Sequence, residues 1–342
     1  MVTPVLGGYG VALPRPVDQQ QMWQDFFAGH CGGDDRAHRI FRHAGVDTRH
    51  FVADPRVDDV SHCSTAERMR RWLSAAVPLG ETALVDALAD AGIPAGDLGL
   101  LTVVSCTGYA TPGLDLALAH RLDTAVDLQR TVIGHMGCYA AIPGLRGTAD
   151  YVRHSGRPAA LLCVELTSLH LQPAPLDTEQ VVAHALFGDA AAAVIVTPDG
   201  PGPEIVDVTA RTAIGHTRDM TWQVTDTGFR MTLSPRIPSV LARHLPDTVA
   251  GLLHRHGLHV DDIDGWAVHP GGRAVLDVTG TALGLDGTAL AASREILRHH
   301  GNCSSPTVLM ILRRLARQRR DNTVALAFGP GLTLYGALLR SR

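Results

Sequence analysis

Three residues of the chain combine reactive chemistry with an adjacent glycine or proline: Cys138, His269 and Asn302. Cys138 follows Gly137 at the expected start of a helix. His269 opens the sequence His-Pro-Gly-Gly, and Asn302 follows Gly301. A helix N-terminus is expected to lower the pKa of the thiol, and an imidazole can take its proton to give a thiolate–imidazolium pair. An amide N–H can donate to a developing oxyanion, so the set suits acyl transfer through a thioester.

The chain repeats itself in two halves, 1–200 and 201–342, and this repeat is what can bring the three residues together. The segment 87–105 resembles the segment 252–270, and 137–152 resembles 301–316. Cys138 and Asn302 then occupy equivalent positions, and His269 follows a strand of the second half. Duplicated halves usually pack about a pseudo-twofold axis, and ligands bind beyond the carboxyl ends of such strands. The spacing therefore predicts one shared site.

Helix and strand patterns alternate along both halves, which predicts an α/β fold with parallel sheets covered by helices. The expected helices cover 81–91, 114–122, 138–152, 245–256, 273–283 and 305–318. The expected strands cover 100–106, 128–133, 159–166, 190–196, 265–268 and 323–328.

Composition excludes several classes of protein. The net charge of −4 disfavours nucleic acid as a partner, and no apolar run is long enough for a membrane span. All thirty basic residues are arginine, which rules out a lysine Schiff base and a P-loop lysine. The start has no signal-peptide pattern, so a cytoplasmic location is expected. No metal-ligand spacing occurs, and free thiols are expected at Cys31, Cys63, Cys106, Cys138, Cys163 and Cys303.

Seven motifs resemble those of the type III polyketide synthases, the chalcone and stilbene synthase family on the thiolase fold. In the family's order they are GVDTRHF (45–51), SCTGYATPGLD (105–115), GHMGCYAAIPGLR (134–146), ALFGDAAAAVIV (185–196), AVHPGG (267–272), GNCSSPTVLMIL (301–312) and AFGPGLT (327–333). The last is the most telling, because other condensing enzymes typically lack it. The resemblance implies a thiolase-like duplicated αβαβα layered fold with two pseudo-twofold related halves.

The resemblance also implies a role for each reactive residue. Cys138 is the nucleophile that carries the starter acyl group and later the growing chain. His269 holds Cys138 as a thiolate and, with Asn302, binds the thioester carbonyl of malonyl-CoA. Decarboxylation then yields an enolate, which attacks the Cys138 thioester. The chain extends an acyl-CoA starter in this way and cyclises the product.

The same comparison suggests residues around the cavity. Phe187 matches an aromatic gatekeeper between the CoA tunnel and the cavity, and Met231 stands where a second gatekeeper is usually Phe. The loop that lines the cyclisation cavity matches Gly329, Pro330 and Gly331.

Candidate CoA contacts come from two segments. Gly271 and Gly272 match backbone near the CoA arm. Arg39, Arg42 and Arg49 lie where the family places basic residues for the CoA phosphates, although a solvated helix face explains them equally well.

Cys106 falls on a cavity-lining strand by this resemblance, and His170 is a further candidate for the cavity wall. Bacterial tetrahydroxynaphthalene synthases carry the same SCTG sequence, which hints at malonyl-CoA as both starter and extender. A buried pocket thiol without chemistry is the favoured alternative for Cys106. Starter, number of extensions and ring closure stay open, with pyrone, resorcinol and naphthalene products all compatible.

The expected enzyme is a homodimer that uses malonyl-CoA and an acyl-CoA starter and needs no metal or redox cofactor. Two alternatives stay open: a ketoacyl-ACP synthase-like enzyme fed by a carrier protein, and an inactive thiolase-fold partner that binds acyl groups. HMG-CoA synthases add a catalytic Glu, for which no suitable motif follows His269. Papain-like proteases share the Cys-His-Asn set but lack the duplication.

Overall fold

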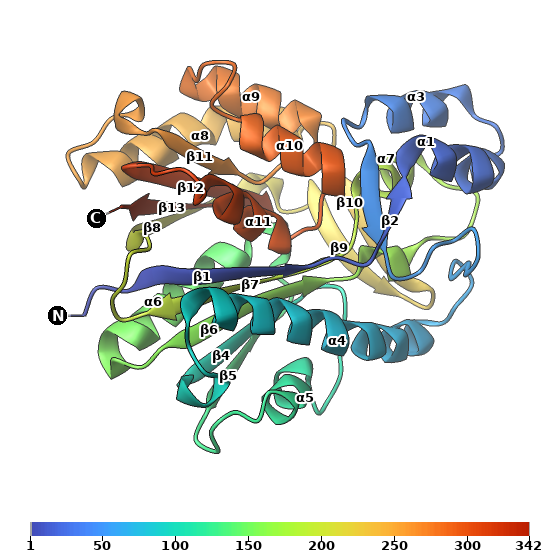
Figure 1. Ribbon diagram of the computed structural model, residues 1–342. Coiled ribbons are helices and arrows are strands. Elements are labelled where there is room, and N and C mark those ends of the chain that lie inside the picture. Colours follow the sequence, from blue (N-terminus) through green and yellow to red (C-terminus); the bar gives the residue numbers. More distant parts are fainter. Residues whose placement is uncertain (1, 342) are drawn as a thin grey trace.

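The computed structural model describes residues 2–341 and places a nine-stranded sheet through the centre of the molecule (Figure 1). Its strands are β1 (Val5–Ala12), β4 (Leu100–Val104), β5 (Gln129–Ile133), β6 (Ala159–Glu165), β7 (Ala190–Thr197), β8 (Glu204–Thr212), β11 (Gly265–Val268), β12 (Asn322–Gly329) and β13 (Thr333–Arg340). Their order is β11-β12-β13-β8-β1-β7-β6-β4-β5. Two small sheets pair β2 (Arg15–Asp18) with β3 (Thr48–Phe51) and β9 (Met220–Thr225) with β10 (Gly228–Leu233).

The predicted duplication is visible in the strand directions. In the first half β1 and β7 pair antiparallel, β7 and β6 pair antiparallel, and β6 and β4 pair parallel. The second half repeats this pattern: β8 and β13 pair antiparallel, β13 and β12 pair antiparallel, and β12 and β11 pair parallel. Within residues 2–341 the second half has no strand equivalent to β5. The two halves of the sheet meet where β1 pairs with β8 at Val5 and Glu204.

The expectation of parallel sheets is wrong, because each half is mixed. A short turn joins β12 to β13, and a connection this short allows only antiparallel pairing. The alternation of helices and strands seen in the sequence describes β4–β6 and β11–β12, where helices do connect parallel strands.

The helices cover the sheet and its ends. They are α1 (Gln19–Met22), α2 (Ala28–His30), α3 (Asp35–His43), α4 (Thr65–Ala91), α5 (Leu114–Arg121), α6 (Ala141–Ser155), α7 (Thr178–Leu186), α8 (Ile237–His254), α9 (Arg273–Leu283), α10 (Ala291–His300) and α11 (Pro306–Leu315). Helix α11 is almost wholly buried in the middle of the fold, as Figure 1 shows. None of the helices described here is long and apolar enough to cross a membrane.

Two helices start well before their predicted positions. Helix α4 begins at Thr65, where Ser64 accepts a hydrogen bond from Glu67 N, and α8 begins at Ile237. Each contains an internal proline, Pro78 or Pro246. Because proline normally interrupts a helix, the sequence pattern underestimates both helices. The predicted bounds of α9 and β11 agree with the structure.

Candidate active site

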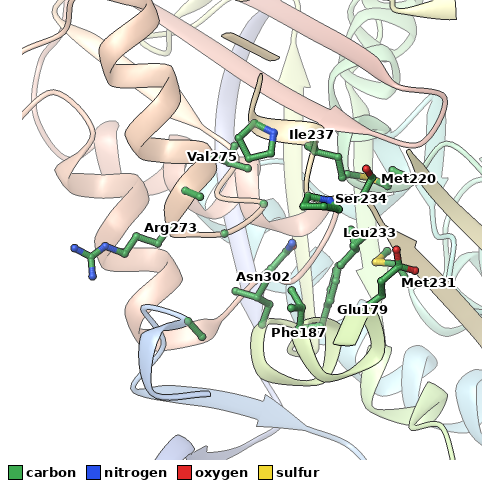
Figure 2. A pocket seen from close by; sticks show the side chains of 18 of the residues that line it. Glu179, Phe187, Met220, Met231, Leu233, Ser234, Ile237, Arg273, Val275 and Asn302 are labelled. Carbon is green, nitrogen blue, oxygen red and sulfur yellow. The ribbon is translucent and has the colours of Figure 1, made fainter. Parts of the chain in front are cut away.

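Cys138, His269 and Asn302 line one cavity of about 670 Å³ (Figure 2). Cys138 comes from the first half of the chain, and the other two come from the second. Each of the three is at most 4% exposed. The remaining wall is mainly apolar, with side chains from α7, α8, α9 and β10. The volume lies in the usual range for a small-molecule site.

A turn supported by the other half of the chain positions Cys138. The residue lies in a 3₁₀ turn, Gly137–Tyr139, between β5 and α6. Gly137 has a φ of +73°, and a Cβ there would lie 2.7 Å from Pro330 Cδ. A Cβ on Gly329 would lie 2.8 Å from the Tyr139 ring. The loop that contains Gly329, Pro330 and Gly331 therefore packs directly behind the turn.

Burial acts on Cys138 and His269 against the predicted ion pair. Burial raises the pKa of Cys138 to about 12, although a hydrogen bond with Ser304 acts in the opposite direction. Burial also lowers the pKa of His269 to about 3. Burial therefore favours the thiol and the neutral imidazole, whereas the start of the helix favours the thiolate, and the thiolate–imidazolium pair stays a prediction.

His269 has its ring nitrogens available. It follows β11, and its backbone N donates to Leu326 O (2.8 Å), which extends the parallel pairing of the strand. Among residues 2–341 neither Nδ1 nor Nε2 finds a hydrogen-bond partner. A buried imidazole with free nitrogens can accept a proton from a thiol or donate to a substrate oxygen.

Hydrogen bonds fix the orientation of the Asn302 amide. Its Oδ1 accepts from Ser304 N (2.8 Å), so its Nδ2 group is turned the other way, toward the middle of the cavity in Figure 2. The backbone of Asn302 is held on both sides, by Leu186 O (2.8 Å) and Gly188 N (3.0 Å). Ser304 itself has a φ of +55°, which is unusual for a residue other than glycine. Sequence reasoning missed Ser304, although it lies within the GNCSSP motif.

A second, smaller cavity, called the inner cavity below, also has Cys138 in its wall. It holds about 20 Å³, which is room for a single water molecule. Its wall includes Cys106, Trp222, Phe187 and Pro330. Phe187 and Met231 line both cavities, as does Cys138, and their role as a pair of gates stays a prediction.

Cys106 lies against a buried carboxylate, Glu165. The Cys106 backbone N donates to Glu165 Oε2 (3.0 Å), and its thiol lies 3.5 Å from the same oxygen. Thr107 and Ser305 hydroxyls also donate to Glu165, each at 2.8 Å. Burial raises the pKa of both Cys106 and Glu165. Cys106 is therefore a protonated pocket thiol in the resting site. No motif of the sequence singles out Glu165, which lies at the end of β6.

Trp222 lines the inner cavity and was also missed by the sequence analysis. Its Nε1 donates to Cys106 O (2.8 Å). Its ring meets His170 and Phe229 edge-on, with centroids 5.5 and 5.9 Å away. His170 stacks on Phe229 at 4.4 Å, so it lies behind Trp222 and supports the wall from outside.

Replacing Trp222 with alanine is expected to lengthen the polyketide product by at least one malonyl unit, because the substitution opens the inner cavity. Mass spectrometry of the products measures the change. Trp222→Phe keeps a ring but lacks the indole N–H, so its main product should match that of the parent. The same product length from Trp222→Ala would show that this ring does not limit the chain.

Of the predicted CoA-phosphate contacts, Arg49 is wrong, and Arg39 and Arg42 stay predictions. Arg49 is 0% exposed and lies inside the protein on β3, so it cannot reach a CoA phosphate. Arg42 is exposed, but it lines a separate groove with Asp18 and Asp47. Arg39 is exposed on α3 outside the wall of the 670 Å³ cavity.

Other basic residues lie at the 670 Å³ cavity, called the outer cavity below. Arg36, His43 and Arg273 line it, together with Gly271 and Gly272. Figure 2 shows the Arg273 guanidinium directed away from the Asn302 side. On helix α3, Arg36 and His43 lie on one face and Arg42 lies on another. The sequence analysis did not separate these two faces.

Acid is expected to destabilise the protein below pH 6.5, because several buried histidines are held neutral. His170 Nε2 lies 2.7 Å from Thr107 O, and its Nδ1 accepts from Phe229 N (3.0 Å), so a second proton would face an N–H group. Burial lowers the pKa of His170 to about 4 and those of His184 and His269 to about 3. The unfolded chain therefore takes up protons near pH 6.5, where the folded chain does not.

Each such histidine costs roughly 1.4 kcal/mol per pH unit between pH 6.5 and its folded pKa. Asp189 opposes this loss, because burial raises its pKa to about 6 and it gains a proton earlier in the folded state. Urea unfolding at several pH values from neutral to mildly acidic measures the net effect. His170→Gln should flatten the pH dependence, and the exposed His120→Gln should not. A constant free energy of unfolding over this range would contradict the prediction.

Comparisons with known proteins agree with this site. The family profile of the chalcone and stilbene synthase N-terminal domain matches residues 8–201, and that of the C-terminal domain matches residues 206–342. A 1,3,6,8-tetrahydroxynaphthalene synthase from Streptomyces peucetius subsp. caesius is 38% identical over 96% of this chain and 91% of its own. The alpha-pyrone synthesis polyketide synthase-like Pks18 of Mycobacterium tuberculosis is 31% identical over 98% of this chain and 90% of its own.

A solved structure, PKS-I from the brown alga Ectocarpus siliculosus, superimposes with a TM-score of 0.93 at 30% identity. The match covers 100% of this chain and 99% of that one, which confirms the thiolase-like fold. The comparisons support a condensing acyltransferase and not a carrier-protein enzyme or an inactive partner. The chain belongs to the chalcone and stilbene synthase family and is a type III polyketide synthase.

Proposed function

We propose that the chain condenses malonyl-CoA units onto an acyl group held as a thioester on Cys138 and then cyclises the product. The observation that carries this proposal is the meeting of three groups at one apolar cavity: the Cys138 thiol, the free His269 imidazole and the Asn302 amide, whose Oδ1 is held by Ser304 N. Thiol, imidazole and amide supply all the chemistry of the reaction, so we propose that it needs no metal or redox cofactor.

Loading of the starter uses Cys138 and His269. The Cys138 sulfur attacks the thioester carbonyl of the acyl-CoA while its proton passes to His269. The bond from the carbonyl carbon to the CoA sulfur then breaks, and the leaving sulfur takes up the proton. Concerted proton transfer removes the need for a preformed thiolate, which burial disfavours.

Extension uses His269 and Asn302. Malonyl-CoA loses its carboxylate as CO₂, and the electron pair of the broken bond forms an enolate. Asn302 Nδ2–H and the His269 N–H donate to the enolate oxygen. The enolate carbon then attacks the Cys138 thioester, forms a carbon–carbon bond and releases the sulfur. The apolar wall supports this step by keeping water from protonating the enolate.

The outer cavity has two sides that suit the two parts of an acyl-CoA. Arg273 and Val275 stand on one side in Figure 2, and Met220, Met231 and Leu233 stand on the other. We place the CoA arm on the α9 side, with its phosphates near exposed arginines, and an apolar acyl group on the other. The small inner cavity favours few extensions.

We further propose a homodimer formed through the edge strand β5. Val132 on this strand is 59% exposed, and Leu116 on the adjoining helix α5 is 44% exposed. A second copy could pair with β5, which would bury these side chains and continue the sheet. Light scattering should give twice the chain mass, and Val132→Arg should reduce it. The exposed Val57→Arg is the matched control, and a monomeric parent protein would exclude the dimer.

A product screen tests the proposed reaction. Purified protein is incubated with malonyl-CoA, alone and with short, long and aromatic acyl-CoA starters, and products are identified by mass spectrometry. Cys138→Ser serves as the control. Product from malonyl-CoA alone would make it both starter and extender, and product only with an added acyl-CoA would identify the starter class. No product and no CO₂ from any CoA thioester would overturn the proposal.

A further inference from the structure

Arg49 is a fully buried cation whose hydrogen-bonding capacity is only partly used. Its Nη1 donates to the backbone oxygens of Phe187 (2.9 Å) and His184. The guanidinium also packs over the Phe51 ring, with 4.8 Å between its Cζ and the centroid. Among residues 2–341 neither Nε nor Nη2 of Arg49 has an acceptor. Buried charged donors without acceptors are costly, so this arrangement calls for a partner.

A cavity of about 30 Å³ adjoins Arg49. Its wall also contains Thr167, Ser168, His184 and Phe187. This space admits one particle of the size of a water molecule or a monatomic ion, and it is too small for a phosphate or a carboxylate ligand. It is distinct from the 20 Å³ inner cavity, although Thr167 and Phe187 line both.

The wall is rich in N–H donors. Arg49 offers Nε–H and Nη2–H. His184 Nε2 accepts from Gln172 N (3.3 Å), so the ring hydrogen is on Nδ1, and burial keeps the ring neutral with a pKa of about 3. The Thr167 and Ser168 hydroxyls of the wall already donate to Gly188 O and Asp189, so the N–H groups are the donors left for an occupant, and an anion needs donors alone.

The nearby carboxylate does not satisfy these donors. Burial lowers the pKa of Arg49 to about 9 and the charge of Asp189 acts in the opposite direction, yet in the described part of the chain the two form no ion pair. Asp189 already accepts from Ser168 N (2.8 Å), Ser168 Oγ (2.5 Å) and Val52 N (2.8 Å). Its hydrogen-bonding capacity is therefore used elsewhere, and it is not part of the cavity wall.

We propose that this cavity binds a single halide-sized anion, chloride under ordinary conditions, held by Nε and Nη2 of Arg49. The anion would complete the hydrogen bonding of the guanidinium. Because Nη1 of the same group holds the Phe187 carbonyl, the anion would also stiffen the backbone of a residue that lines both active-site cavities. The binding site itself does not depend on the proposed reaction.

Bromide crystallography tests the site directly in the parent protein. Crystals soaked in sodium bromide should show an anomalous peak beside Arg49 and His184. A water-like density without anomalous signal at this position, in crystals that show bromide elsewhere, would overturn the proposal. Because this measurement uses no variant, it does not depend on whether a changed chain folds.

Thermal unfolding provides a second, independent test. At constant ionic strength, the melting temperature should be about 2 °C or more higher in potassium chloride than in potassium gluconate, since an anion that binds only the folded chain stabilises it. Arg49→Met should abolish the difference. Arg317→Met, a change at an exposed arginine, should retain it. Equal melting temperatures of the parent protein in the two salts would contradict the proposal.

Discussion

Replacing Cys138 with alanine is expected to lower polyketide formation by about 10⁴-fold or more, because no other atom at the site can carry the acyl chain. Slow decarboxylation of malonyl-CoA should persist, since the substitution leaves His269 and Asn302 in place to stabilise the enolate. Product is measured by mass spectrometry, and decarboxylation is measured as CO₂ released from labelled malonyl-CoA.

Cys163→Ala is the matched control for this experiment. Cys163 is also a fully buried thiol, and it lies on β6 outside the walls of both active-site cavities. This variant should form product at a rate close to that of the parent. Polyketide formation by Cys138→Ala at a comparable rate would show that Cys138 is not the nucleophile.

Replacing Asn302 with aspartate is expected to slow condensation by about 10²–10³-fold. The change is nearly isosteric, and a carboxylate oxygen can still accept from Ser304 N. It removes the N–H donors, however, and places a negative charge beside the developing enolate. Loading of Cys138 should be far less affected, so labelled acyl-CoA should still acylate the protein while both decarboxylation and product formation fall.

The control for this charge change is Asn322→Asp at the start of β12, where the side chain contacts Asp262 O and Arg340 Nε and not the cavity. The variant should retain catalytic activity. If Asn302→Asp kept more than half of the parent rate, the amide would not be the donor to the enolate.

The convergence of Cys138, His269 and Asn302 could be predicted because a duplication leaves its trace in the sequence as a repeated spacing. Glycines at Gly92 and Gly284 end α4 and α9 in the left-handed conformation, so these helix ends were also predictable from residue type. The motifs also identified the family, because each motif is a short continuous stretch of sequence.

Protonation and burial could not be predicted in this way, because they depend on side chains from many segments. The pattern TRHF gives no sign that Arg49 is enclosed, since the rings and carbonyls around it come from α3, α7 and β3. The raised pKa of Cys138 likewise results from the removal of water by both halves of the chain. Trp222 lies in the wall of the inner cavity because β9 packs there, a tertiary contact that no local sequence pattern indicates.

The contact between Gly137 and Pro330 has a consequence for how substrates enter. The turn that carries the reactive sulfur and the loop from the opposite half lie too close together for a side chain to fit between them. A hinge motion that separated the halves between reaction cycles would pull this contact apart and deform the turn. We therefore expect substrates to enter lengthwise through the outer cavity. The length of the flexible CoA arm then limits which thioesters can reach the Cys138 sulfur.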